Sequence, residues 1–173
     1  KVKVTVTGTD NVAPTGKITI AGNEWTEFLN TITFGHFFKE TQDVTITGTD
    51  NTGKDVTIEY LLTDTKQTEA SLENADWMEY SQVLHIEENQ KLIVYARITD
   101  ASDNSTVINS DGIVLYSDAQ AVTQSVTYTR TSNEDVTARV NLNSNTVAGI
   151  ANGSNSLRAG TDYTVSNDGT ITL

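Results

Sequence analysis

The sequence predicts an all-β protein built from tandem antiparallel β-sandwiches. Along most of the 173 residues, short stretches alternate between apolar and polar side chains, which is typical of strands with one buried face. Asp, Asn, Gly and Ser cluster between these stretches, where turns need them. Only one short segment has a helical pattern. These three observations favour small sheets packed face to face.

The segment that best defines the fold is 91–104, KLIVYARITDASDN. Its apolar residues alternate, with Leu92, Val94 and Ala96 on one face and Ile93, Tyr95 and Arg97 on the other. The alternation ends in an Asp/Ser/Asn turn. We therefore expect a central strand, and Tyr95 resembles the tyrosine corner of immunoglobulin-like sandwiches.

The other elements of a first sandwich can be placed in order. Strands are predicted at 17–20, 31–38, 43–49, 55–62, 83–86, 106–108 and 113–116. A short helix is predicted at 68–75, with Thr68 as its N-cap and Leu72 buried. Strict alternation predicts one shared core containing Ile18, Ile20, Val44, Ile46, Leu92 and Val94.

We expect three parts along the chain. Residues 1–11 are predicted to be the end strand of a preceding module or a linker, and residues 12–117 a complete sandwich. Residues 118–173 carry four short predicted strands, at 125–130, 135–142, 162–165 and 170–173. A complete sandwich has about seven. The second module is therefore expected to be incomplete, with the polypeptide continuing past Leu173.

Charge and composition exclude several functions. The formal net charge is −12, so phosphate polymers and anionic membrane surfaces are repelled, and we expect no nucleic-acid and no membrane partner. The chain has no cysteine, which is compatible with the cytosol and with a bacterial secreted protein that lacks disulfides. No run of ~18 apolar residues is present.

Acidic turns are the candidate metal ligands. Asp10, Asp50, Asp100 and Asp103 could bind calcium, which takes several oxygen ligands. However, Asp also occupies turns for conformational reasons, and no D-x-D-x-D-G loop is present. We expect no cofactor and little effect of a chelator on thermal stability, with calcium as the open alternative. The two histidines, His36 and His85, have no metal-site spacing and are expected to be ordinary strand residues.

Aromatic residues are the candidate glycan-stacking platform. Trp25, Trp77 and Tyr80 are the candidates for stacking on sugar rings, although such residues are more often part of a core. Lys17 is out of phase with Ile18 and should face solvent, which disfavours an isopeptide bond. No nucleophile-elbow, P-loop or zinc-protease motif is present, so we expect these modules not to be an enzyme.

Two resemblances to known families follow from longer stretches. Residues 13–116 resemble a bacterial Ig-like domain of Gram-positive surface and secreted multimodular proteins, through APTGKITI, FLNTITFGHFFKETQDVTITGTDN, VTIEYLLTD and YARITDASDNSTVINSDGIVL. Residues 125–173 are similar to the first half of an X2 module, an Ig-like fold found beside glycoside hydrolases and in cellulosomal scaffolds; the matching stretch is DVTARVNLNSNTVAGIANGSNSLRAGTDYTVSNDGTITL.

The resemblances imply tandem immunoglobulin-like antiparallel sandwiches with no catalytic residues. They imply non-catalytic spacer or accessory modules of a secreted or cell-surface bacterial protein, with a carbohydrate-active enzyme as the expected parent. The implied partners are the neighbouring domains of the same polypeptide and a polysaccharide or glycan. A carbohydrate-binding module and an adhesin stalk that binds a host protein are the alternatives.

Overall fold

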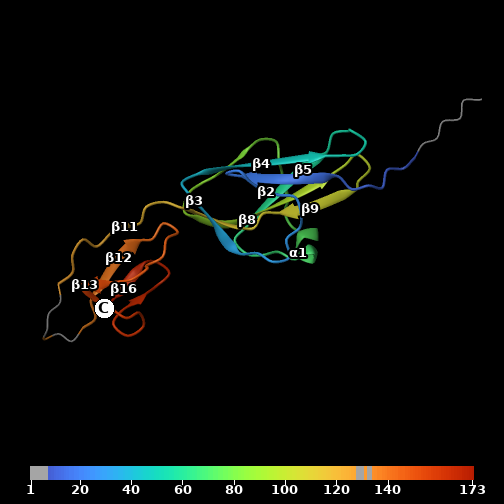
Figure 1. Cartoon of the computed structure of the whole chain (residues 1–173). Coiled ribbons are helices and arrows are strands. Elements are labelled where there is room, and N and C mark those ends of the chain that lie inside the picture. Colours follow the sequence, from blue (N-terminus) through green and yellow to red (C-terminus); the bar gives the residue numbers. More distant parts are fainter. Residues whose placement is uncertain (1–7, 128–130, 132–133) are drawn as a thin grey trace, which may run out of the picture.

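A computed structural model describes residues 8–127, 131 and 134–173. The chain forms one group of strands up to Tyr116 and a second, smaller group from Gln120 onward (Figure 1). Of residues 1–11, predicted to be an end strand or a linker, 1–7 lie outside the described residues and 8–11 are not in a strand. Of the predicted strand at 125–130, residues 125–127 are not in a strand and the rest lie outside the described residues.

One layer of the first sandwich is a four-stranded antiparallel sheet. Its strands lie in the order β2 (Asn23–Trp25), β1 (Thr15–Ile20), β4 (Gln42–Thr49) and β7 (Leu84–Ile86). In the central pair, Ile18 lies opposite Ile46 and Ile20 opposite Val44. This register places the four apolar side chains on one face, as their alternation predicts.

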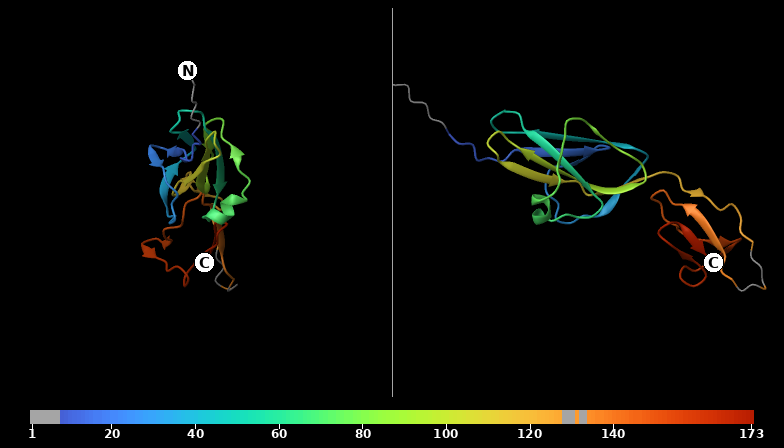
Figure 2. Two further views of the ribbon diagram at one scale, coloured as in Figure 1. Left: turned by 90° about the vertical axis from the view of Figure 1, so that its right-hand side faces the viewer. Right: turned by 180° about the vertical axis from the view of Figure 1, so that it is seen from behind.

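The other layer contains the central strand, β8 (Gln90–Thr99). Its order is β3 (Phe34–Lys39), β10 (Gly112–Tyr116), β8, β5 (Thr57–Thr63) and β6 (Met78–Glu79), and β9 (Ser105–Asn109) also pairs with β8. The two layers face each other in the views of Figure 2. The part of the chain that the structure describes is all-β apart from one short helix, which confirms the predicted fold class.

One strand pair departs from the antiparallel expectation, because β3 runs parallel to β10. The segment before β3 is held by Asp111, whose carboxylate accepts hydrogen bonds from the Thr33 N–H at 2.6 Å and the Thr33 hydroxyl at 2.7 Å. Gly112 follows, and a Cβ there would lie 2.6 Å from the Phe34 ring. A parallel pair of distant segments leaves no local signal in the sequence.

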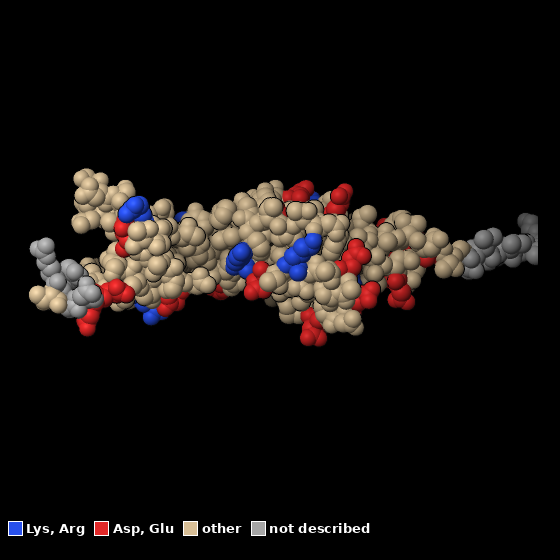
Figure 3. All heavy atoms as spheres, turned by 90° about the horizontal axis from the view of Figure 1, so that it is seen from below, with Lys and Arg blue, Asp and Glu red and all other residues tan. Residues whose placement is uncertain are grey.

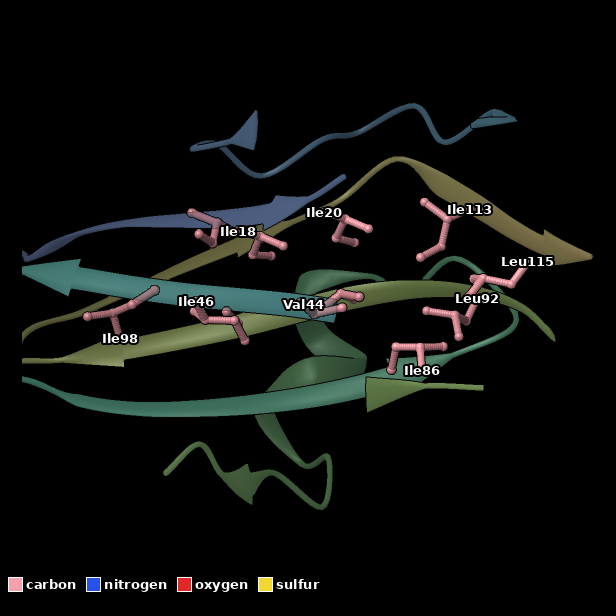
Figure 4. Packing of buried hydrophobic residues seen from close by; sticks show 12 residues of the cluster. Ile18, Ile20, Val44, Ile46, Ile86, Leu92, Ile98, Ile113 and Leu115 are labelled. Carbon is pink, nitrogen blue, oxygen red and sulfur yellow. The ribbon is translucent and has the colours of Figure 1, made fainter. Parts of the chain in front are cut away.

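The main core lies between the two layers and confirms the predicted residues. Figure 4 shows the apolar side chains meeting between the strands. The six predicted members are 0–4% exposed: Ile18, Ile20, Val44, Ile46, Leu92 and Val94. Further buried members are Ile86, Ala96, Ile98, Ile108, Ile113 and Leu115.

A second, smaller core covers the opposite face of β8. Ile93 and Tyr95 are 0% and 1% exposed and pack with Leu72 of α1 (Glu69–Glu73). Thr68 caps this helix and accepts a hydrogen bond from the Ser71 N–H, as predicted from the sequence. The tyrosine-corner expectation is wrong, because the Tyr95 hydroxyl accepts its hydrogen bond from the N–H of Gln67, 28 residues upstream.

The second group of strands has little core of its own. One sheet has the order β11 (Gln120–Ala121), β12 (Thr137–Asn141), β16 (Thr170–Thr172) and β15 (Thr164–Val165), and a separate hairpin joins β13 (Ala151–Asn152) to β14 (Asn155–Ser156). Among residues 118–127 and 134–173, Tyr163 is the single buried hydrophobic residue, at 8% exposed. Most of this group is therefore backbone pairing without a packed interior.

Candidate functional site

Three of the four acidic candidates come together at one end of the first sandwich. Asp10 precedes β1, Asp50 follows β4 and Asp100 follows β8. One carboxylate oxygen from each residue lies within 4.8 Å of the other two. Asp103 does not join them, since it is exposed at the tip of the turn after β8 with a φ of 65°. We call Asp10, Asp50 and Asp100 the acidic cluster.

Asp100 is fixed in place by the turn that follows β8. Its Oδ1 accepts hydrogen bonds from the N–H groups of Ser102 at 2.7 Å and Asn104 at 2.9 Å, and its Oδ2 accepts one from Asn104 Nδ2 at 2.8 Å. Asp readily forms this local turn. The Asn104 side chain, together with these N–H groups, holds the pKa of Asp100 below its ordinary value. Asp100 is only 6% exposed, so these hydrogen bonds take the place of water around its carboxyl group.

Asp50 is held by one oxygen only. Its Oδ2 accepts hydrogen bonds from the Thr52 hydroxyl and from the Thr52 N–H, the latter at 2.9 Å, and these bonds lower the pKa of Asp50. Its Oδ1 is buried and accepts no hydrogen bond from any described residue. The two oxygens of this carboxylate therefore differ: one orients the side chain and the other is unpartnered.

Asp10 links the segment before β1 to both turns. Its Oδ1 accepts hydrogen bonds from the Val12 N–H at 3.2 Å and from Asn51 Nδ2 at 3.5 Å, and its carbonyl oxygen accepts one from Asn104 Nδ2 at 3.3 Å. All ligand atoms that the cluster offers are oxygens. Such a set suits a hard cation such as Ca²⁺ or Mg²⁺ and does not suit zinc.

Two of the three aromatic candidates serve the packing of the first sandwich. Trp25 is half-buried against the main core and meets His36 edge to face at 5.4 Å. The Tyr80 hydroxyl accepts a hydrogen bond from the Ile46 N–H at 3.1 Å, and its ring contacts Tyr60. Because both rings are partly buried against the main core and pack against another aromatic ring, neither forms a free flat platform.

Trp77 lies beside a shallow pocket next to α1. Its Nε1 donates a hydrogen bond to the Leu72 carbonyl at 3.0 Å, and the Arg97 guanidinium lies over its ring at 4.8 Å. Arg97 is in turn paired with Glu59 at 2.7 Å. The pocket has a volume of about 240 Å³, and Phe28 lines it together with Trp77. One face of the indole is thus occupied by a cation of this chain.

The histidines and Lys17 lie in strands, as expected. His36 in β3 has its Nε2 3.8 Å from Asp111, and His85 in β7 has its Nδ1 2.6 Å from Asp43. Neither joins a group of three metal-ligating side chains among the described residues. Lys17 forms an exposed ion pair with Glu24 at 2.7 Å.

A site that the sequence did not indicate is the junction between the two strand groups. Asn89 Oδ1 accepts hydrogen bonds from the Ser117 N–H at 3.1 Å and hydroxyl at 2.9 Å. From the second group, Asn145 Nδ2 donates to the Ser117 carbonyl at 2.6 Å and Asn143 Nδ2 donates to the Asp118 carbonyl at 2.7 Å. Lys39 adds an ion pair with Asp118 at 3.1 Å.

We call six residues of this junction the junction clamp: Lys39, Asn89, Ser117, Asp118, Asn143 and Asn145. The sequence signal for it is weak, since an Asn-rich turn such as LNSN is common and its partners lie 25 to 28 residues away. The clamp is polar: Lys39, Asn89 and Asp118 are exposed, and the other three residues are half-buried. It can fix an angle between two units but offers no group for chemistry.

On the face of the molecule that Figure 3 shows, carboxylates are scattered, with few lysines or arginines between them. None of the helices in the described parts of the chain is long and apolar enough to cross a membrane. The surface thus agrees with the net charge of −12.

The comparisons with known proteins bear on the second group of strands. A family model described as "Carbohydrate binding domain X2" matches residues 122–173. The match supports the resemblance of this region to an X2 module, which belongs to a non-catalytic family. No curated protein and no solved structure matches the chain. The likeness of residues 12–117 to Gram-positive Ig-like modules stays a prediction.

Proposed function

We propose that this chain supplies non-catalytic spacer modules of a secreted or cell-surface protein that acts on carbohydrate. The X2 match supports a carbohydrate-related accessory role for the second unit. The first unit is a sandwich that the chain enters at one end and leaves at the other (Figure 2). This arrangement holds neighbouring domains of the same polypeptide apart.

The observation that carries the proposal is the junction clamp. A spacer must limit the angle between its units, and short connections do this only when their backbone is held from both sides. Here the carbonyls of Ser117 and Asp118 accept hydrogen bonds from the second unit, while the N–H of Ser117 donates to Asn89 of the first. Motion between domains is the default where no large apolar interface joins them, so in this chain the hydrogen bonds of the clamp are the contacts that would restrain the angle.

Spin-label distance measurements test the proposal directly. The chain has no cysteine, so Asp64→Cys and Ser154→Cys give one exposed label on each unit. We expect a single narrow distance distribution. Asn145→Ala should broaden it, because the Ser117 carbonyl loses its 2.6 Å donor. Asn74→Ala, an exposed asparagine at the end of α1 that makes none of the junction hydrogen bonds, is the matched control. A distribution that is already broad without substitution would contradict the spacer role.

Glycan binding is the second candidate, because the X2 family is described as carbohydrate-binding and Trp77 borders a pocket. A glycan array separates the two functions. Saturable binding that is lost in Trp77→Ala and retained in Trp25→Ala would place a sugar in the pocket. No binding to any glycan, with a narrow inter-unit distance, would leave the spacer role. Binding to a host protein without binding to any glycan would instead indicate an adhesin stalk.

A further inference from the structure

We propose that the acidic cluster of Asp10, Asp50 and Asp100 is a calcium site at the end of the sandwich where the chain enters β1. The proposal rests on the meeting of the three carboxylates and on a second observation at Asp50. It is independent of the spacer role, and no comparison assigns a metal to this chain.

The second observation is the unpartnered oxygen of Asp50. Among the described residues, Asp50 Oδ1 is the buried side-chain polar atom that lacks a hydrogen-bond partner. Leaving a buried acceptor unpaired is costly, and more so when the group is charged. This oxygen belongs to a carboxylate that lies within 4.8 Å of two others. A cation among the three would supply the missing partner.

The charges around the acidic cluster favour binding of such a cation. Asp100 is only 6% exposed, so its repulsion from Asp50 is poorly screened by water, and this repulsion acts to raise the pKa of Asp50. Lys54 is the nearby cation that acts on the Asp100 carboxyl. None of the three acids forms an ion pair with another residue within 8–127 and 134–173.

The geometry favours calcium over other ions. Oxygens on opposite sides of Ca²⁺ lie ~4.6–5.2 Å apart, since each Ca–O distance is ~2.3–2.6 Å. Three oxygens within 4.8 Å of one another all lie within about 2.8 Å of a common point, so small side-chain adjustments bring them to the Ca–O distance. Mg²⁺ keeps most of its water and demands a tighter octahedron of ~2.0–2.1 Å bonds. Protein zinc sites usually contain His nitrogen or Cys sulfur ligands, which the cluster lacks.

The hydrogen bonds already present orient the ligands. Thr52 holds Asp50 through Oδ2 and leaves Oδ1 free, and the turn after β8 fixes Asp100. An ionised carboxylate has about four lone-pair sites, so Asp100 can accept its three hydrogen bonds and still ligate. Calcium bound here would join the segment before β1 to two turns that follow strands of different layers. In a spacer, it would stiffen this end of the sandwich.

Calorimetric and thermal titration of the whole chain with CaCl₂ tests the site. At constant ionic strength, we expect saturable binding of one Ca²⁺ with a Kd of ~10⁻⁴–10⁻³ M, the range of extracellular modules. The melting temperature should rise with CaCl₂ and return to its starting value with EDTA. Amide NMR shifts should be confined to the segment before β1 and the turns after β4 and β8.

Two variants separate a built site from general screening of acidic charge. Asp50→Asn should weaken binding at least tenfold, and Asp103→Asn, in the same loop region but outside the cluster, should leave it unchanged. If Asp50→Asn fails to fold, Asp10→Asn, before the first strand, takes its place with the same expectation. An equal response to MgCl₂, an equal response of Asp50→Asn and Asp103→Asn, or no saturation up to 10 mM (about ten times the weakest Kd expected) would each overturn the assignment.

Discussion

Replacing Ile20 by alanine tests the arrangement of the main core. Ile20 is 0% exposed, lies opposite Val44 and packs between the two layers. The substitution removes three carbon groups, which costs roughly 2.4 kcal/mol at about 0.8 kcal/mol for each. A residual cavity of up to about 70 Å³ adds up to about 1.7 kcal/mol at ~24 cal/mol per Å³. The expected loss is therefore about 2–4 kcal/mol.

Urea unfolding followed by tryptophan fluorescence measures this loss. Both tryptophans of the chain, Trp25 and Trp77, lie in the first sandwich, so the signal reports on that unit alone. The midpoint should fall by about 1–2 M, given a urea slope of about 2 kcal/mol per M, the middle of the usual range. Thr45→Ala is the matched control, since this exposed residue of β4 lies on the face away from the core. Its cost should not exceed about 1 kcal/mol.

Two outcomes would refute the reasoning. A loss below about 1 kcal/mol in Ile20→Ala would mean that this position can collapse or is not in the core, since buried Ile→Ala changes cost about 2–5 kcal/mol. An equal loss in Thr45→Ala would mean that the strand presents its other face to the interior. Either result would contradict the strand register that was derived from the alternation of apolar and polar residues.

Three further predictions follow from particular residues. Gly169→Ala should destabilise the second unit in a thermal melt, because the φ is 80° and a Cβ would lie 1.9 Å from the Val140 carbonyl oxygen. Amides of β12 and β16 should exchange with deuterium faster than those of β8, because Tyr163 is the single buried hydrophobic side chain of the described second unit and little core protects its strands. Equal protection of the two units would contradict this. The melting temperature should fall as pH drops below about 4, because two carboxyl groups have a lowered pKa in the folded state. The pKa of Asp100 is lowered by the hydrogen bonds that it accepts from Asn104. Burial acts to raise the pKa of Asp111, but the hydrogen bonds from Thr33 and Gly112 outweigh burial and lower it. A carboxyl with a lowered folded-state pKa contributes its stability above the unfolded pKa and loses it as pH falls, so a melting temperature constant from pH 6 to 3 would contradict this.

The sequence alone determined the features that depend on neighbours in the chain. Alternation with a period of two fixes which face of a strand is apolar, so Ile18, Ile46 and Leu92 were correctly placed in one core. The cap at Thr68 depends on a few adjacent residues and was also predicted correctly. The X2 resemblance of the second unit likewise came from a local run of residues.

Tertiary structure alone decided what distant segments do when they meet. Ile93 and Tyr95 are buried because α1 covers the second face of β8, and Trp77 is covered on one side by Arg97. Asp10, Asp50 and Asp100 lie 40 to 90 residues apart in sequence yet place oxygens within 4.8 Å of one another. A strand pattern specifies which face is apolar, but strand order and the meeting of turns depend on packing between the sheets, which no local pattern encodes.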